Sequence, residues 1–190
     1  GDNLYGGAHN MVILDPDSAG GPDVVLVATD GGLIHRTADD GETWEEPAGL
    51  PSNLSAARRL KVTSDGTEVV FILLKAGNAW RLYRSEDNGA SFDSVFDLGS
   101  VEGDFWLPRD GSEGVYVISD ALYASYDLGD TWETIGSRPA NASQIELTAS
   151  EAGAPRFWAV LGESNIYRTD NLGQSWDPVS YTHLTLPTSG

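Results

Sequence analysis

The residues best suited to chemistry in this sequence are carboxylates beside aromatic side chains. Glu102 and Asp104 precede Phe105 and Trp106, and Asp120 lies in a turn further along the chain. Enzymes cleave glycosidic bonds with a pair of carboxyl groups, one as the acid and the other as the nucleophile or base. These three carboxylates are therefore candidate catalytic residues for carbohydrate hydrolysis. The alternative is that Glu102 and Asp104 belong to a solvated connector between two strands.

Polar residues near predicted turns form a second set of candidates, for ligand binding. Asp30 lies in an Asp-Gly-Gly loop, and loops at equivalent places in the chain read as simple hairpin turns. A turn is therefore the favoured interpretation of Asp30 too. The candidate binding residues are His9, Asp30, Asn78 and Glu163.

Histidine and arginine give little support for other chemistry. His35 takes a position that tyrosine holds in the other units, and His183 lies close to the last residue, so that His9 remains alone. A histidine-based metal site or catalytic triad needs more partners than this. We predict no metal and no cofactor. The arginines form no recognisable substrate-binding set: Arg36, Arg84 and Arg168 share one repeated position, and the others considered are Arg58, Arg59, Arg109 and Arg138.

The composition excludes several classes of partner. The chain has 190 residues, with 11 Lys and Arg against 29 Asp and Glu, and a net charge of −18. Nucleic acid is a poor partner because phosphate contacts need a cationic face. No apolar run approaches the roughly 20 residues of a membrane-spanning helix, so membrane insertion is not expected. The absence of cysteine excludes disulfides and thiolate metal sites.

One eight-residue pattern recurs four times in the sequence. The pattern is [Ser/Thr]-x-[Asp/Asn]-x-Gly-x-[Ser/Thr]-[Trp/Phe], and its copies are Thr37–Trp44, Ser85–Phe92, Ser125–Trp132 and Thr169–Trp176. The copies are spaced by about 40–50 residues, a period typical of repeat architectures. Each copy is typical of a turn, because Asp or Asn accepts backbone hydrogen bonds and Gly adopts a positive φ. The final aromatic residue begins a strand and can bury a large apolar area.

This pattern resembles the Asp-box, or BNR repeat, of sialidases, xyloglucan-hydrolysing enzymes and sortilin-type receptor domains. In those families the box lies between the third and fourth strand of a β-propeller blade, so the resemblance implies a structural role. The fourth copy departs from the family by carrying Asn for Asp, which keeps an acceptor oxygen. The residues assigned to the boxes are Asp39, Gly41, Trp44, Asp87, Gly89, Phe92, Asp127, Gly129, Trp132, Asn171, Gly173 and Trp176.

Each unit reads as strand, strand, turn, strand, box and strand, with no sustained helical period. The sequence therefore predicts an all-β fold, a partial β-propeller of four consecutive four-stranded antiparallel blades. The expected blades cover about 8–50, 53–98, 101–137 and 142–178. Antiparallel alternation places the boxes on one face, and the turns between second and third strands on the opposite face with the candidate site residues.

The last residues differ from the rest. Val179 to Leu184 resemble the translation of a transposase-end sequencing adapter, so we expect 179–190 to be non-native and the propeller to occupy 1–178. No strand is left over to close a ring with another end of the chain. We therefore expect the sequence to be a fragment, with missing blades of the same chain as partners.

Two functions of different classes remain open. The first is a secreted or surface propeller, extracellular, periplasmic or attached to the cell, that binds a glycan or an extracellular protein. The second is a fragment of a sialidase-like or xyloglucanase-like glycoside hydrolase whose catalytic residues lie mostly in missing blades. The Arg-Ile-Pro motif of sialidases is absent from the sequence. An intracellular assembly-factor propeller is a third candidate.

Overall fold

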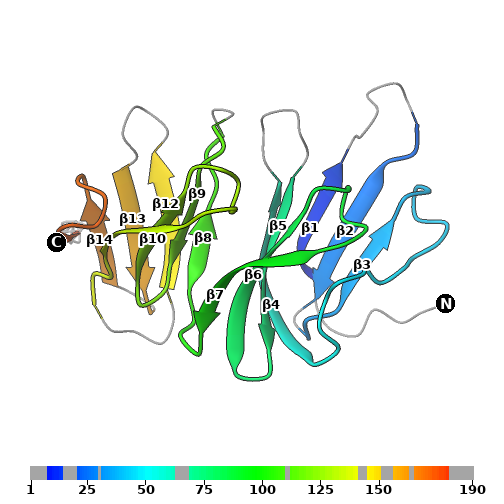
Figure 1. The fold of residues 1–190 in the computed structure, drawn as a ribbon, viewed down its shortest axis with the longest axis horizontal. Coiled ribbons are helices and arrows are strands. Elements are labelled where there is room, and N and C mark those ends of the chain that lie inside the picture. The colour runs from blue at the N-terminus through cyan, green and yellow to red at the C-terminus, as the bar shows by residue number, and fades with distance from the viewer. Residues whose placement is uncertain are drawn as a thin grey trace, which may run out of the picture.

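The computed structural model is an all-β structure (Figure 1). It describes residues 8–14, 21–29, 31–62, 69–109, 112–140, 145–150, 156–162 and 165–179. Four antiparallel sheets stand side by side in chain order, from the N-terminal sheet at the right of Figure 1 to the C-terminal sheet at the left. No described residue is helical, so no described segment can cross a membrane as a helix.

Each sheet is one blade, and its strands follow the chain order from one edge to the other. Blade 1 contains β1 (Ala8–Leu14), β2 (Val24–Thr29) and β3 (Ile34–Thr37). Blade 2 contains β4 (Leu54–Val62), β5 (Val70–Ala76), β6 (Ala79–Ser85) and β7 (Asp93–Gly99). Blade 3 contains β8 (Asp104–Trp106), β9 (Val115–Ile118), β10 (Ala121–Ser125) and β11 (Glu133–Ser137). Blade 4 contains β12 (Ile145–Ser150), β13 (Arg156–Leu161), β14 (Asn165–Thr169) and β15 (Asp177–Pro178).

These sheets confirm the predicted partial β-propeller, with one local difference in blade 1. Its outermost strand is reduced to a single antiparallel bridge between Arg36 and Glu45, in which each backbone N–H donates to the other carbonyl at 2.9 Å. The chain then leaves blade 1, and Ala48 forms a parallel bridge with Ser91 of blade 2. The outer edge of blade 1 is thus paired partly with its neighbour.

Each inner blade is covered on both faces by a neighbouring blade, which explains the continuous apolar run in its second strand. In β5, Val70, Ile72 and Leu74 pack toward blade 1, whereas Phe71 and Leu73 pack toward blade 3. Successive side chains of a strand point to opposite faces, so a sheet buried on both sides needs a continuous apolar run. The core is therefore divided into three layers, one between each pair of successive blades.

The loops gather on two opposite faces. On the first, which we call the repeat-turn face, two repeated turns contact described residues that lead into the second strand of a blade. Asp23 N donates to Asp40 Oδ1 of the first turn at 2.9 Å, and Leu128 N of the third turn donates to Glu113 O at 3.1 Å. On the second, which we call the connector face, the turns between second and third strands of blades 2 and 3 contact described residues of the connections between blades, as where Gly77 N donates to Asn53 O at 3.3 Å. There Arg138 Nη1 donates to Ser119 O at 2.6 Å. The fold thus separates the repeated turns from Glu102 and Asp120.

The layer between blades 2 and 3 should contribute strongly to stability through its buried aromatic rings. Phe71 is fully buried, and its ring centroid lies 6.5 Å from that of Phe105 in the next blade. Replacing Phe71 with Ala removes this contact and leaves a cavity, which should lower the free energy of unfolding by about 3–5 kcal/mol. Urea denaturation measures the loss. Tyr126→Ala, at an exposed ring, is the control, and an equal loss in both variants would contradict this account of the core.

Candidate functional site

Asp104 is a buried link between blades, which corrects its interpretation as part of a solvated connector. It lies in β8 with no exposed surface, and its Oδ2 accepts a hydrogen bond from Leu147 N of β12 at 2.8 Å. A buried carboxylate is tolerated where it accepts hydrogen bonds, and this one joins the inner strands of blades 3 and 4. A ligand on the protein surface cannot reach it in this arrangement.

Glu102 lies in the connection that leads into β8 and pairs with an arginine from another blade. Arg58 of β4 forms an ion pair with its carboxylate, and the same guanidinium donates from Nη2 to Ile145 O at 2.7 Å. The carbonyl of Arg58 accepts from Asn10 Nδ2 at 3.0 Å. These contacts connect all four blades near their inner strands.

The sequence did not single out Arg58 for this role. In the sequence, Arg58 and the other arginines outside the repeated position form no recognisable set. Its partners Glu102 and Ile145 lie 44 and 87 residues away along the chain. No local pattern reports a pairing at such separations, so only the arrangement of the blades reveals it.

Asp120 is the exposed carboxylate of the three. It lies in the turn between β9 and β10 and accepts hydrogen bonds at 2.9 Å from Tyr123 Oη and from Ser119 Oγ. The bond from Tyr123 is the main reason that the pKa of Asp120 is lowered. Burial lowers the pKa of the neighbouring Arg138, against the effect of the charge on Asp120. Asp120 is thus an ionised acceptor, suited to binding a donor more than to giving up a proton.

The structure does not bring the binding candidates into one described cluster. Asn78 is exposed in the turn between β5 and β6. The backbone of His9 belongs to β1, but its side chain is outside the described part, as are Asp30 and Glu163 altogether. The binding assignments therefore stay predictions. Among the residues that the structure does describe, no group of His, Cys, Asp and Glu is arranged to hold a metal ion.

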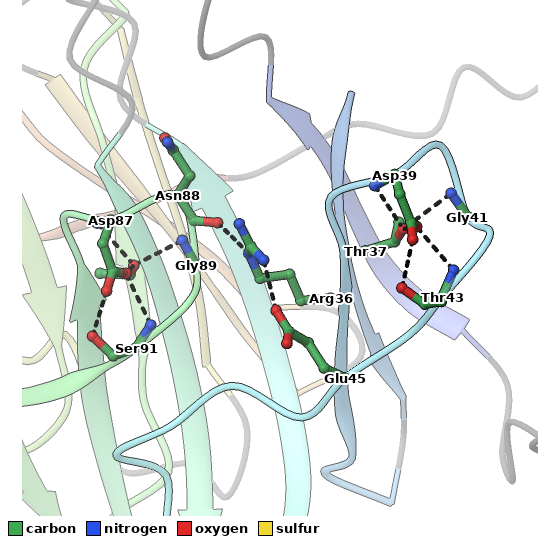
Figure 2. A network of polar contacts seen from close by, with 11 residues as sticks. Arg36, Thr37, Asp39, Gly41, Thr43, Glu45, Asp87, Asn88, Gly89 and Ser91 are labelled. Carbon is green, nitrogen blue, oxygen red and sulfur yellow. Dashed lines mark hydrogen bonds and ion pairs between the residues drawn. The ribbon is translucent and has the colours of Figure 1, made fainter. Parts of the chain in front are cut away.

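The four repeated turns share one hydrogen-bond network. In the third turn, Ser125 Oγ donates to Asp127 Oδ1 at 2.7 Å and accepts from Gly129 N at 2.7 Å. The other end of the turn is held by Thr131, whose N and Oγ1 donate to the two carboxylate oxygens of Asp127 at 2.8 and 2.6 Å. The first and second turns repeat these contacts around Asp39 and Asp87, as Figure 2 shows.

The fourth turn keeps the network although it carries Asn171. The side-chain oxygen still accepts from Thr169 Oγ1 and Ser175 N, at 2.8 and 3.0 Å. One bond reverses its direction, because Asn171 Nδ2 donates to Ser175 Oγ at 2.9 Å. An amide can do this and a carboxylate cannot, which explains why Asn is compatible with the turn.

Two successive residues in each turn have positive φ, whereas the sequence pointed to the glycine alone. The residue before the glycine is left-handed in all four turns, and it is leucine in two of them: Asp40, Asn88, Leu128 and Leu172, with φ of 57°, 56°, 53° and 56°. Leucine rarely adopts this conformation. The hydrogen-bond network around it therefore decides the backbone in these turns, against the residue's own preference.

A small pocket of about 170 Å³ lies beside the first repeated turn. Its lining includes Arg36 and Glu45, which form an ion pair at 2.7 Å, and Asp39, which is engaged within the turn. Ligand sites are commonly larger, about 300–1,000 Å³, and apolar. This pocket is better explained by the packing of the turn than by a ligand.

Comparison with known proteins relates the chain to two kinds of propeller. No protein-family model matches it. It is 26% identical over 160 residues to an oligoxyloglucan-reducing end-specific xyloglucanase of Emericella nidulans, covering 74% of this chain and 18% of the enzyme. It is 25% identical over 165 residues to the photosystem II assembly protein Ycf48 of a Synechococcus, covering 83% of this chain and 46% of that protein.

A solved structure supports the fold. An ancestral GH74 enzyme superposes with a TM-score of 0.64 at 15% identity, over 93% of this chain and 24% of the enzyme. At that identity the likeness shows the β-propeller fold alone. The chain thus spans less than a fifth of the xyloglucanase and under half of the assembly protein, which share its scaffold.

The repeated turns should make the protein sensitive to acid. Hydrogen bonds from Thr131 lower the pKa of Asp127 from 3.8 to about 2. A carboxylate with a depressed folded-state pKa stabilises the fold above its unfolded pKa, and this contribution is lost as the pH falls from about 4 to about 2. Asp127→Asn should therefore reduce the drop in melting temperature between about pH 7 and pH 3.

The fourth turn provides the reciprocal change. Asn171→Asp should enlarge the same drop, because it adds a carboxylate that accepts the bonds seen at Asp127. Asp177→Asn, at an exposed residue outside the turns, is the control and should leave the drop unchanged. Equal acid sensitivity in all three variants and the parent would contradict the role assigned to the turns.

Proposed function

We propose that this chain belongs to an Asp-box β-propeller that acts as a binding scaffold, with its ligand on the connector face. The observation that carries the proposal is that two of the candidate catalytic carboxylates contact other blades. Asp104 is buried against Leu147 N, and Glu102 is paired with Arg58, so both serve the joining of blades. In the described part of the chain, they do not form a pair of accessible carboxyl groups flanking a cleft, as glycoside hydrolysis requires.

The Asp-box assignment is supported by the regular chemistry of the turns. A hydroxyl, a carboxylate or amide, and a glycine N–H recur at the same positions in the four blades. Such regularity serves a scaffold, since each turn closes its own blade. The connector face, by contrast, differs from blade to blade and can be specific for a ligand.

The ligand class follows from the groups on that face. Asn78 and Asp120 are exposed there, and Arg138 is partly exposed. Such a mixture of donors and acceptors suits a glycan or a polar protein segment. With a net charge of −18, the chain disfavours polyanionic ligands. We place the protein outside the cytoplasm, in the extracellular medium, the periplasm or at the cell surface, by its likeness to a xyloglucanase.

Ligand binding should depend on the exposed residues of the connector face. Asp120→Ala and Asn78→Ala should each raise the dissociation constant for a ligand found on a glycan array or a peptide array about fivefold or more, the effect of losing ~1 kcal/mol. Glu46→Ala, at an exposed carboxylate on the outer edge of blade 1, is the matched control. A ligand bound equally by all these variants would place the site elsewhere.

A glycoside hydrolase is the second candidate, favoured by the match to the xyloglucanase over 74% of this chain. On this hypothesis most catalytic residues lie in missing blades, and within this chain Asp120 or Glu102 would contribute an acid, base or nucleophile, because Asp104 is buried. We expect this chain to release no reducing ends from xyloglucan. Release by the parent that falls about a hundredfold in Asp120→Asn or Glu102→Gln would replace the binding proposal with the hydrolase.

A further inference from the structure

The second repeated turn contains the one Asn-Gly pair of the sequence, Asn88 followed by Gly89. Asparagine before glycine is chemically labile, because glycine has no side chain to hinder its backbone nitrogen from attacking the preceding side-chain amide. The other three turns carry aspartate or leucine before the glycine, namely Asp40, Leu128 and Leu172. Asn88 is therefore the position in the repeated turns at which the sequence favours spontaneous loss of ammonia.

This reaction, deamidation, needs the backbone nitrogen of Gly89 to reach the side-chain carbonyl carbon of Asn88. The nitrogen forms a bond to that carbon and gives up its proton, and the side-chain nitrogen of Asn88 leaves as ammonia. Water then opens the resulting cyclic imide at either of its carbonyl groups. The products are aspartate, which keeps the original backbone, and isoaspartate, whose backbone runs through the former side chain and is one carbon longer.

The folded turn keeps that nitrogen away from the amide. Gly89 N donates to Ser85 Oγ at 2.8 Å, and Gly89 is buried. A Cβ added to Gly89 would lie 2.5 Å from Leu26 Cδ1, so the glycine packs directly against blade 1. Asn88 is held in the left-handed conformation, with φ of 56°. The attack therefore requires the turn to open and to move away from blade 1.

Blade 1 holds the second turn closed through further hydrogen bonds. Arg36 Nε donates to Asn88 O at 2.9 Å, and Figure 2 shows this bond between the first two turns. Two more bonds come from the chain that leaves blade 1: Ala48 N donates to Ala90 O at 2.9 Å, and Phe92 N donates to Ala48 O at 3.0 Å. Opening of the turn thus breaks the contact between blades 1 and 2.

The next pair of blades repeats the arginine contact without the labile amide. Arg84 Nη1 donates to Leu128 O at 2.9 Å, and Leu128 takes the place of Asn88 in the third turn. Leucine has no amide to lose. Arg84 therefore provides a matched control, because its removal loosens a similar contact that does not protect Asn88.

The two products differ in whether the contact can form again. Asp40 occupies the equivalent position of the first turn, with φ of 57°, so aspartate is compatible with the turn. Isoaspartate adds a carbon to the backbone between the carbonyl that Arg36 binds and the nitrogen that Ser85 binds. Both bonds cannot then be made with Gly89 packed against Leu26.

We propose that Asn88 is a deamidation site controlled by the contact between blades 1 and 2. The closed contact preserves the amide, and each opening exposes it to the reaction. Isoaspartate then prevents the contact from closing, so the modification makes a transient opening permanent. Both blades of the contact belong to the described chain, and the reaction depends neither on a ligand of the connector face nor on further blades.

Mass spectrometry of peptides, after incubation at mildly alkaline pH, measures the rate of deamidation at Asn88. The reference is a free peptide with the sequence of residues 85–92, in which nothing protects the glycine nitrogen. The folded parent should react about tenfold more slowly than this peptide, or more slowly still, because only its open fraction reacts. Arg36→Ala and Ser85→Ala should each raise the rate about threefold or more, since each removes a bond that keeps the turn closed.

Arg84→Ala is the matched control and should deamidate at Asn88 as the parent does. Circular dichroism at the temperature of incubation shows whether each variant is folded, so that a faster reaction can be assigned to local opening. The proposal is overturned by a parent that reacts as fast as the peptide. It is also overturned if folded Arg36→Ala and Ser85→Ala proteins react no faster than the parent, or if Arg84→Ala accelerates the reaction equally.

Urea denaturation separates the effect of the new charge from that of the longer backbone. Asn88→Asp should unfold as the parent does, because the first turn already accepts aspartate at this position. Protein enriched in isoaspartate at position 88 by incubation should unfold at a lower urea concentration. Equal stability of the isoaspartate protein and the parent would contradict the permanent opening of the contact.

Discussion

Each blade of this protein has two apolar faces, and each face needs a neighbouring blade to exclude water from it. In β5 this requirement appears as an uninterrupted apolar strand whose alternate residues enter two different layers. Apolar burial supplies most of the driving force for folding, so no single blade can be stable alone. The contacts from Arg36 to Asn88 O and from Arg84 to Leu128 O add direction to this stacking, because each joins the third strand of one blade to the turn of the next.

The same constraint decides what the acidic residues can do. Near the inner strands, a carboxylate either accepts hydrogen bonds from the next blade or lies exposed at a turn. Asp104 accepts from Leu147 N, Glu102 pairs with Arg58, and Asp120 remains exposed on the connector face. Two of the three carboxylates whose types suggest hydrolysis, Glu102 and Asp104, thus contact a neighbouring blade. Related propellers bear the names of a xyloglucanase and of an assembly protein, which agrees with a scaffold whose activity depends on the loops it carries.

Much of the fold could be predicted because it depends on patterns of residues close together in the sequence. The repeated turns gave the number of blades, and strand alternation separated the repeat-turn face from the connector face. The single bridge at the outer edge of blade 1 was not predicted, since the sequence around Glu45 resembles the outer strands of other blades. The left-handed conformation of Leu128 and Leu172 was also missed, because their own preference opposes it and a network of neighbours imposes it.

The sequence by itself determined the all-β class, the four repeated turns and the two-sided apolar strands, since each depends on residues close together in the chain. Only the tertiary structure decided which candidate site residues are buried, paired or exposed. The burial of Asp104, the pairing of Glu102 with Arg58, and the contact of Arg36 with Asn88 O depend on which blade lies beside which. Such contacts join residues tens of positions apart, and side-chain chemistry alone does not specify them. The register of the stacked blades does.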